Sequence, residues 1–177
     1  MRNIVPGIAS LVQHLEAMQI KSELYRPPCC SECGRAGVWR HGCYERKSGR
    51  GAEHHLNPIS IPRFLCPKCH KTLSTLPECI PPHRWYLWCI QQLVLLHCLA
   101  GLSLHKISHQ TQLGRSTVRR WWQRFCEQFL LHRDALSNAI HELGTHNDIM
   151  SFWHACLRHL SLAQAMRHCH CSGVVIP

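Results

Sequence analysis

The chain has 177 residues, of which 45% are hydrophobic, and its 20 Lys and Arg against 10 Asp and Glu give a formal charge of +10. This length allows one medium domain or two small ones, and the charge favours nucleic acid, before an anionic membrane surface, as a partner. The alternative is a basic protein with no specific partner. Thirteen cysteines argue against a secreted disulfide scaffold, because the count is odd and no signal peptide precedes them, so we expect a cytoplasmic protein.

The first 26 residues predict a short amphipathic helix over 8–20. Leu11, Leu15 and Met18 recur there at the spacing of one helical face. Pro27 and the proline after it end any helix. We therefore expect a separate amino-terminal segment, residues 1–26.

Glycine and proline become frequent in residues 27–82, which predicts a small β module. Apolar residues over 56–65, interrupted by Pro58 and Pro62, indicate short strands at sheet edges. Ser48-Gly-Arg-Gly51 is typical of a hairpin tip. This segment is too short to bury a large core, and a bound metal would compensate for that.

Two Cys-x-x-Cys turns in this module, Cys30-Ser-Glu-Cys33 and Cys66-Pro-Lys-Cys69, predict a metal site. Four thiolates in a tetrahedron are what Zn²⁺ accepts at a closed structural site, so we expect one structural ion and no catalytic water. Cys29 can replace Cys30, and further candidate ligands are His41, Cys43, His70 and Cys79. A redox role is the less favoured alternative, since no α/β unit with a helix after the motif is indicated.

The chain after Pro82 reads as all-helical, with no proline before Pro177. The expected helices cover residues 85–100, 104–111, 116–131, 133–143 and 149–168, with residues 172–177 frayed. The longest apolar stretch, 85–104, contains Gln91, Gln92 and His97, which favours a buried helix over a membrane span.

Residues 104–128 have the pattern of a helix-turn-helix. Leu104 and Ile107 would face inward from the first helix. Gly114 can take the positive φ of a sharp turn, and Ser116 is a good N-cap for the second helix. The residues of that second helix expected inward are Val118, Trp121 or Trp122, and Phe125.

The opposite face of the second helix carries groups that contact phosphates and base edges in a major groove. These candidate DNA-binding residues are Arg115, Ser116, Thr117, Arg119, Arg120, Gln123 and Arg124. The alternative is an ordinary basic amphipathic helix with a solvated face.

A series of motifs in this order resembles a known family: Cys30-Ser-Glu-Cys33-Gly34, Arg40-His-Gly-Cys-Tyr-Glu-Arg46, Ile59-Ser-Ile-Pro-Arg63, Cys66-Pro-Lys-Cys69, Thr72-Leu-Ser74 and Leu76-Pro77. The series is similar to the amino-terminal zinc-binding region of bacterial insertion-sequence transposases, and to small relatives made only of zinc ribbon plus helix-turn-helix. The resemblance covers about residues 27–130. It implies zinc at the four cysteines of the two turns and recognition of DNA at an element's ends.

The chain departs from that family in lacking an identifiable catalytic domain. Such transposases add an RNase H-like sheet whose three acidic residues hold Mg²⁺ for phosphoryl transfer. Here only Asp134, Glu142 and Asp148 lie in a plausible region, within helical sequence. We therefore expect a protein that binds DNA without cutting it, acting alone, as a homodimer, or with a separately encoded transposase catalytic subunit.

Two other hypotheses remain open. One is a complete enzyme, such as a metal-dependent nuclease using the tail His168-Cys-His-Cys171, which could also hold a second metal ion. The other is a protein-interaction zinc module whose surface includes Trp85, Trp88, Trp121, Trp122 and Trp153, although tryptophans at helical spacing are more often core. The remaining helix cysteines, expected as buried small hydrophobes, are Cys89, Cys98, Cys126 and Cys156.

The sequence thus predicts an α+β protein without membrane spans. Its expected segments are an amino-terminal helix (1–26), a zinc-ribbon module (27–82), a helix-turn-helix region (83–131), and carboxy-terminal helices with a tail (132–177).

Overall fold

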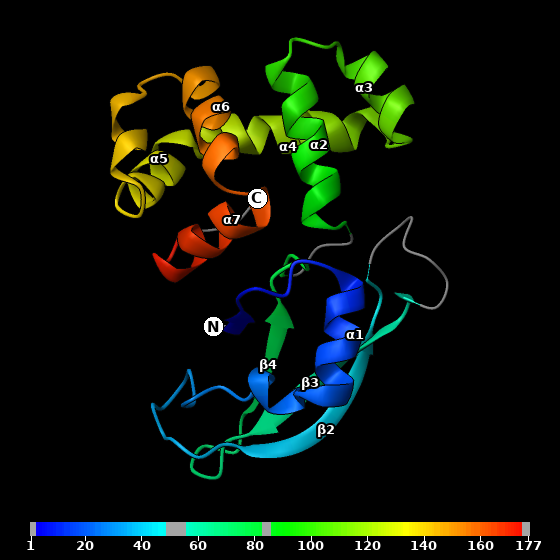
Figure 1. The fold of residues 1–177 in the computed structure, drawn as a ribbon, viewed down its shortest axis with the longest axis vertical. Coiled ribbons are helices and arrows are strands. Elements are labelled where there is room, and N and C mark those ends of the chain that lie inside the picture. The colour runs from blue at the N-terminus through cyan, green and yellow to red at the C-terminus, as the bar shows by residue number, and fades with distance from the viewer. Residues whose placement is uncertain (1–2, 49–55, 83–85, 175–177) are drawn as a thin grey trace. The chain divides into compact units, whose positions relative to one another are not determined.

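The structure is a computed structural model that describes residues 3–48, 56–82 and 86–174. The chain divides into two compact units, residues 1–87 and 88–177 (Figure 1). The first is a small sheet with a helix and the second is entirely helical, so the predicted α+β class is confirmed. The expected segments 1–26 and 27–82 both fall in the first unit.

A four-stranded sheet with strand order β1-β4-β3-β2 forms the first unit. Its elements in chain order are β1 (Asn3–Val5), α1 (Leu11–Ile20), the 3-10 helix η1 (Ser22–Tyr25), β2 (Trp39–Arg46), β3 (Ile59–Leu65) and β4 (Thr72–Pro77). The neighbours β2–β3 and β3–β4 are antiparallel, whereas β1 is parallel to β4. This parallel pairing joins the start of the chain to the end of the ribbon.

The prediction of interrupted edge strands over 56–65 is wrong, because β3 is one continuous strand in the interior of the sheet. Pro62 is tolerated there for two reasons. It lies opposite an irregular stretch of β2 between Arg40 and Cys43, and pairing with β4 begins only at Arg63. A proline that donates no hydrogen bond can occupy a bulge of this kind. Of the predicted hairpin tip, residues 49–51 lie outside the described part of the chain.

Helix α1 begins at Leu11, three residues later than predicted, because Ser10 is its N-cap. The Ser10 hydroxyl accepts a hydrogen bond from the N–H of Gln13 at 3.2 Å, which satisfies one of the free donors of the first turn. Leu11 shares a buried cluster with Ile59 and other residues of the sheet. Figure 1 shows α1 lying beside this sheet.

His14 connects three parts of the first unit from a fully buried position. Its Nε2 lies 3.0 Å from the Ser60 carbonyl of β3, and its Nδ1 lies 2.5 Å from the Tyr25 hydroxyl of η1. A carbonyl only accepts, so Nε2 carries the proton and the neutral ring accepts from Tyr25 at Nδ1. Burial lowers the pKa of His14 below its usual 6.5, against the opposing effect of the Ser60 hydrogen bond.

The second unit consists of α2 (Trp88–Leu99), α3 (Leu104–Thr111), α4 (Arg115–Glu127), α5 (Phe129–Ser137), the 3-10 helix η3 (His141–Thr145), α6 (Ile149–His159) and α7 (Leu162–Cys171). One buried cluster draws residues from all of these elements except α3. Its centre is aromatic: Phe125 and Phe152 each meet Trp153 edge-on, with ring centroids 5.3 and 5.4 Å apart. Within the described residues, no helix combines the length and apolar character needed to span a bilayer.

The predicted helix 116–131 is wrong, because the chain bends at Gln128 and a new helix, α5, begins at Phe129. Phe129 lies four residues after Phe125, so the helical spacing of apolar residues continues through the bend. The sequence pattern therefore does not indicate where the first helix ends. The predicted helix 133–143 is also wrong, because α5 ends at Ser137 and the 3-10 helix η3 begins at His141.

The predicted helix 149–168 is likewise two helices, α6 and α7. Ser161 accepts a hydrogen bond from the N–H of Gln164 and the Gln164 side chain accepts one from the N–H of Ser161. This capping box starts α7. The Ser-x-x-Gln spacing that predicts it is present in the sequence.

His14 makes the stability of the first unit dependent on pH. Its folded pKa is below its unfolded value, so the unfolded chain binds the proton more readily. The stabilisation is therefore present above about pH 6.5 and is lost as the pH falls below it. The effect is at most about 1.4 kcal/mol per pH unit, the limit for one proton.

We expect the free energies of unfolding of the native chain and His14→Gln, measured by denaturant titration between pH 5 and 8, to differ by a pH-dependent amount. The comparison cancels the acid sensitivity of the cysteines, which both proteins share. A constant difference across this range would contradict the prediction.

Candidate metal centre and helix-turn-helix surface

Two turns with the same hydrogen bonds position the cysteine pairs, and we call them the first and second knuckle. In each, the N–H of the first cysteine donates to the carbonyl five residues on, at 2.8 Å for Cys30 and 3.0 Å for Cys66. The N–H four residues on donates back, at 2.9 and 3.0 Å. Gly34 and His70 occupy this fourth position, with φ of +69° and +56°. The turn requires a left-handed residue there, which glycine adopts without strain.

The knuckles bring together the four cysteines predicted as metal ligands. The Sγ atoms of Cys30 and Cys69 are 3.6 Å apart, those of Cys33 and Cys66 are 3.5 Å apart, and all four lie within 4.8 Å of one another. Cys30 and Cys66 are buried, and the other two are partly exposed. This set of sulfurs can hold a metal ion.

The sulfurs differ in how easily they ionise. The backbone N–H groups of Cys69 and Lys68 donate to the Cys66 sulfur and lower its pKa to about 6. For Cys69, the backbone N–H of Lys71 has the same effect, but burial and hydrogen bonds to the neighbouring sulfurs outweigh it and raise the pKa to about 12. Crowded sulfurs resist ionising together, and a bound cation removes that resistance.

An ion pair joins the two knuckles beside the sulfurs. The Lys71 ammonium lies 3.0 Å from the Glu32 carboxylate. Both side chains are exposed, so the ion pair adds little to the free energy of folding, but it holds the two knuckles next to each other.

The alternative ligands do not join this cluster, which is the one group of its kind in the described residues. Cys29 is exposed next to Cys30, and His41 and Cys43 are exposed on β2. His70 forms the second knuckle's turn, and Cys79 is buried among apolar side chains.

The tail residues 168–171 form the last turn of α7. The predicted frayed end, 172–177, is wrong over its first part, because the Val174 N–H donates to the Cys169 carbonyl at 2.9 Å and Val174 packs against the core. Residues 175–177 lie outside the described part of the chain. Cys169 faces the core, where burial raises its pKa to about 12. Cys156 is also buried, as predicted, but the prediction is wrong for Cys89 and Cys126, which are exposed. The residues of the tail do not form a metal cluster with one another in the described structure.

The helix-turn-helix forms with a turn different from the one predicted. Residues 112–114 separate α3 from α4. Gln112, not Gly114, takes the left-handed conformation, with φ of +55°, and its side-chain amide donates to the His109 carbonyl at 2.8 Å. Gly114, not Ser116, is the N-cap of α4 and has φ of −62°. Gln112 therefore ends α3 as a left-handed C-cap.

Both helices bury the face that the sequence predicted. Val118, Trp121 and Phe125 of α4 are buried, and Trp122 is partly buried. Ile107 of α3 is fully buried, with Leu104 partly so. Both helices also pack against α2, which supports the motif as a third helix.

The predicted DNA-binding residues lie on the opposite face of α4. Five of them, Arg115, Ser116, Arg119, Arg120 and Gln123, are exposed. At 100° per residue they cover less than half of the helix circumference. Thr117 and Arg124 are partly buried at one border of this arc. We call these seven residues the α4 basic face.

The three acidic residues that lie in the region of a transposase catalytic domain each have a different local partner. Asp148 is the N-cap of α6, Glu142 lies 3.6 Å from the His159 imidazole, and Asp134 lies 3.4 Å from the Arg133 guanidinium. All three are exposed, and they form no metal-binding group in the described residues.

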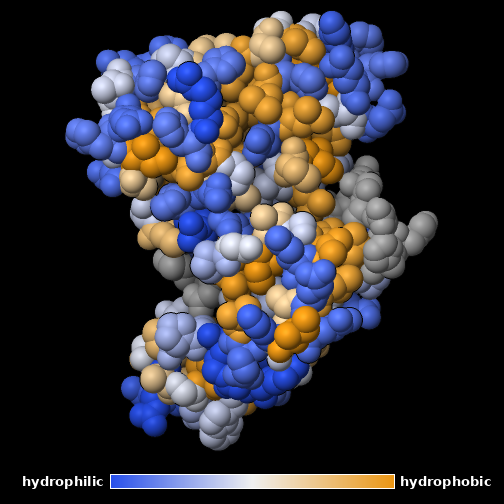
Figure 2. Space-filling view, viewed as in Figure 1, coloured by the Kyte–Doolittle hydropathy of each residue, from blue (hydrophilic) through white to orange (hydrophobic). Residues whose placement is uncertain are grey.

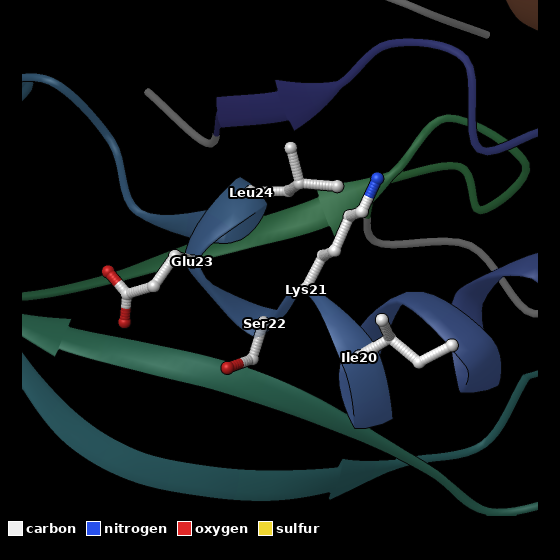
Figure 3. Close-up of a pocket in the computed structure, with 5 residues that line it drawn as sticks. All are labelled: Ile20, Lys21, Ser22, Glu23 and Leu24. Atoms are coloured by element: carbon white, nitrogen blue, oxygen red, sulfur yellow. The ribbon is translucent and has the colours of Figure 1, made fainter.

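An open pocket of about 520 Å³ lies at the turn from α1 to η1 (Figure 3). It is lined by the continuous segment 20–24. In Figure 3 the Lys21 and Leu24 side chains point to one side of this turn and that of Glu23 away from them. The polar side chains of this segment are not directed at one point, so the pocket does not resemble a catalytic site.

The tryptophans predicted for an interaction surface lie mainly in the core. Trp88, Trp121 and Trp153 are buried and Trp122 is partly buried. Trp85 lies outside the described residues.

A family model described as "Domain of unknown function (DUF6431)" matches residues 28–121, more than half of the chain. The chain belongs to this family. The DUF6431 region contains both knuckles, β2 to β4, α2, α3 and the first half of α4, so it includes the metal centre and most of the α4 basic face. No curated protein and no solved structure matches the chain.

The geometry of the candidate metal centre predicts different effects for two cysteines of the first unit, Cys66 and Cys29. Cys66→Ser removes one of four ligands and should lower metal affinity more than the roughly 10–100-fold that loss of an outer partner costs. The first unit should then lose its folded structure, because its core is small without metal. Cys29→Ser, which changes an exposed sulfur beside Cys30, should leave both properties intact.

Metal content per chain and near-ultraviolet circular dichroism measure the two effects. Equal metal content in the two variants would contradict the assignment of ligands.

Proposed function

We propose that this protein is a zinc-stabilised, sequence-specific DNA-binding protein, resembling the DNA-recognition part of a bacterial insertion-sequence transposase. The observation that carries the proposal is the α4 basic face, a row of exposed cationic and amide side chains on the second helix of a helix-turn-helix. Helices of this kind enter the major groove, where such side chains reach base edges and phosphates.

Zinc suits the four sulfurs better than other common ions. Zn–S bonds of about 2.3 Å in a tetrahedron require sulfurs about 3.8 Å apart. Two of the pairs here are 3.5 and 3.6 Å apart, and all four sulfurs lie within 4.8 Å of one another. Thiolate ligands select soft or borderline metals over Mg²⁺ and Ca²⁺. Four protein ligands leave no open position, so the ion supplies structure.

Charge also favours DNA as the partner. The chain carries a formal charge of +10, and the α4 basic face has four arginines. Figure 2 shows hydrophilic side chains gathered over α3, whose exposed residues include His105, Lys106 and His109. In a helix-turn-helix, the first helix crosses the DNA backbone, so cations on α3 would contact phosphates.

A homodimer, or a complex with a separately encoded catalytic subunit, is the second candidate function. The observation that favours it is on α5, where Leu130 and Leu131 are 60% and 56% exposed. Adjacent exposed leucines are typical of protein contacts. The proposal includes no strand cleavage by this chain, since Asp134, Glu142 and Asp148 have the separate roles described above.

The experiment that tests the proposal is a DNA-binding titration of the zinc-loaded protein over a series of salt concentrations. DNA flanking the protein's own gene is compared with a scrambled duplex, each with and without a chelator. We expect preferential binding to the flanking DNA that falls with salt and is lost with the chelator. Equal or negligible binding to both duplexes would overturn the proposal.

Two arginine variants test the α4 basic face. Arg119→Ala should reduce the slope of log K against log salt by about 0.9, the value for one phosphate contact, and Arg119→Ala with Arg120→Ala by about 1.8. Arg158→Ala, which removes the same charge from an exposed position on α6, should leave the slope unchanged. Equal slopes for Arg119→Ala and Arg158→Ala would mean that only net charge matters.

A further inference from the structure

A second surface with nucleic-acid chemistry lies on the sheet of the first unit. Trp39 begins β2 and is 60% exposed, directly after the buried Val38. It pairs across the sheet with Leu65 of β3, which in turn pairs with Thr72 of β4. Directly paired residues lie on one face of a sheet, so these three side chains form a row across three strands. The row has a large exposed aromatic ring at one end and an exposed hydroxyl at the other.

Arg63 lies beside this row. Side chains alternate along a strand, so Arg63 shares a face with Leu65. Its guanidinium carbon is 6.0 Å from the centroid of the Tyr44 ring, and its Nη2 donates to the Thr72 hydroxyl at 3.4 Å. Both partners are uncharged, so they fix the guanidinium without neutralising it. We call Trp39, Arg63, Leu65 and Thr72 the Trp39 platform.

Arg63 is the cation of the Trp39 platform itself. Arg40, the residue after Trp39, pairs with the buried Phe64 and so lies on the opposite face of the sheet, where it donates to the Ser22 hydroxyl at 3.4 Å. Glu23 and Glu32 bring negative charge to this end of the unit, but each is ion-paired with another cation, at 2.6 and 3.0 Å.

We propose that the Trp39 platform binds an unpaired nucleotide of single-stranded DNA, with the base stacked on Trp39 and a phosphate at Arg63. Bases in a duplex already stack on their neighbours and present only their edges in the grooves. Only an unpaired base offers its face to an indole ring. The formal charge of +10 on the chain favours approach of the phosphates of the same strand. The proposal uses no residue of α4, so it stands apart from duplex recognition by the helix-turn-helix.

The test measures binding of the zinc-loaded full chain to a fluorescent oligothymidylate of about 15 nucleotides, a length near the upper single-strand site sizes. The same oligonucleotide in duplex form is the parallel probe. We expect Trp39→Ala to weaken single-strand binding roughly fivefold to 150-fold, the range for one stacked base, while Trp39→Phe keeps most of it. Arg63→Gln should reduce the salt slope by about 0.7, the value for one contact on a single strand.

Val12→Ala is the matched control, because Val12 is a 52% exposed apolar residue of the same unit on α1. It should bind like the native chain, and all variants should keep the native metal content. Equal single-strand binding by Trp39→Ala and Val12→Ala would overturn the proposal. An equal loss on single strand and duplex would also overturn it, because Trp39 would then not read unpaired bases. Arg119→Ala should affect only the duplex, so a failure of either proposal is seen separately.

Discussion

The meeting of four cysteine sulfurs is the constraint on which the first unit depends. The sheet has one short helix over it and divides its buried side chains between two small clusters, which is little apolar surface for about 87 residues. The two knuckles lie at strand ends of the sheet. The first precedes β2, and the second connects β3 to β4. A cation bound among the sulfurs would therefore fix the strand register, and through the register the positions of Trp39 and Arg63.

The sequence predicts best where one residue type has one physical use. Two Cys-x-x-Cys pairs predict the metal centre because few other structures need thiols at that spacing, and the inward face of α4 follows from helical periodicity. Helical periodicity does not detect a change in the direction of the chain, so it predicts one helix across Gln128 and one across Ser161. The Ser-x-x-Gln pattern of the capping box at Ser161 does indicate the second of these helix starts. The placement of Pro62 inside the sheet was unpredictable from β3 alone, because the irregularity that accommodates it belongs to β2. The Trp39 platform could not be predicted either, since cross-strand register decides which side chains become neighbours.

The second unit supports the α4 basic face rigidly. The second unit has a large aromatic core, and α4 is held by Val118, Trp121 and Phe125, so its exposed arginines project from a rigid support. The turn before α4 is equally well fixed, because Gln112 is held by a hydrogen bond to His109 and the Ser108 hydroxyl donates to the Leu113 carbonyl at 2.5 Å. Rigid support of this kind suits recognition by shape and hydrogen bonding, since little entropy is lost on binding.

The parallel pairing of β1 with β4 has a consequence for how the chain folds during synthesis. Asn3 pairs with Thr75 and Val5 with Pro77, so β1 is synthesised roughly seventy residues before the strand with which it pairs. Closing so long a loop is entropically costly, and contacts of high sequence separation form slowly. The second knuckle is complete at Lys71, directly before β4 begins at Thr72. The ribbon can therefore acquire its register first, and we expect β1 to pair with β4 as a late step of folding.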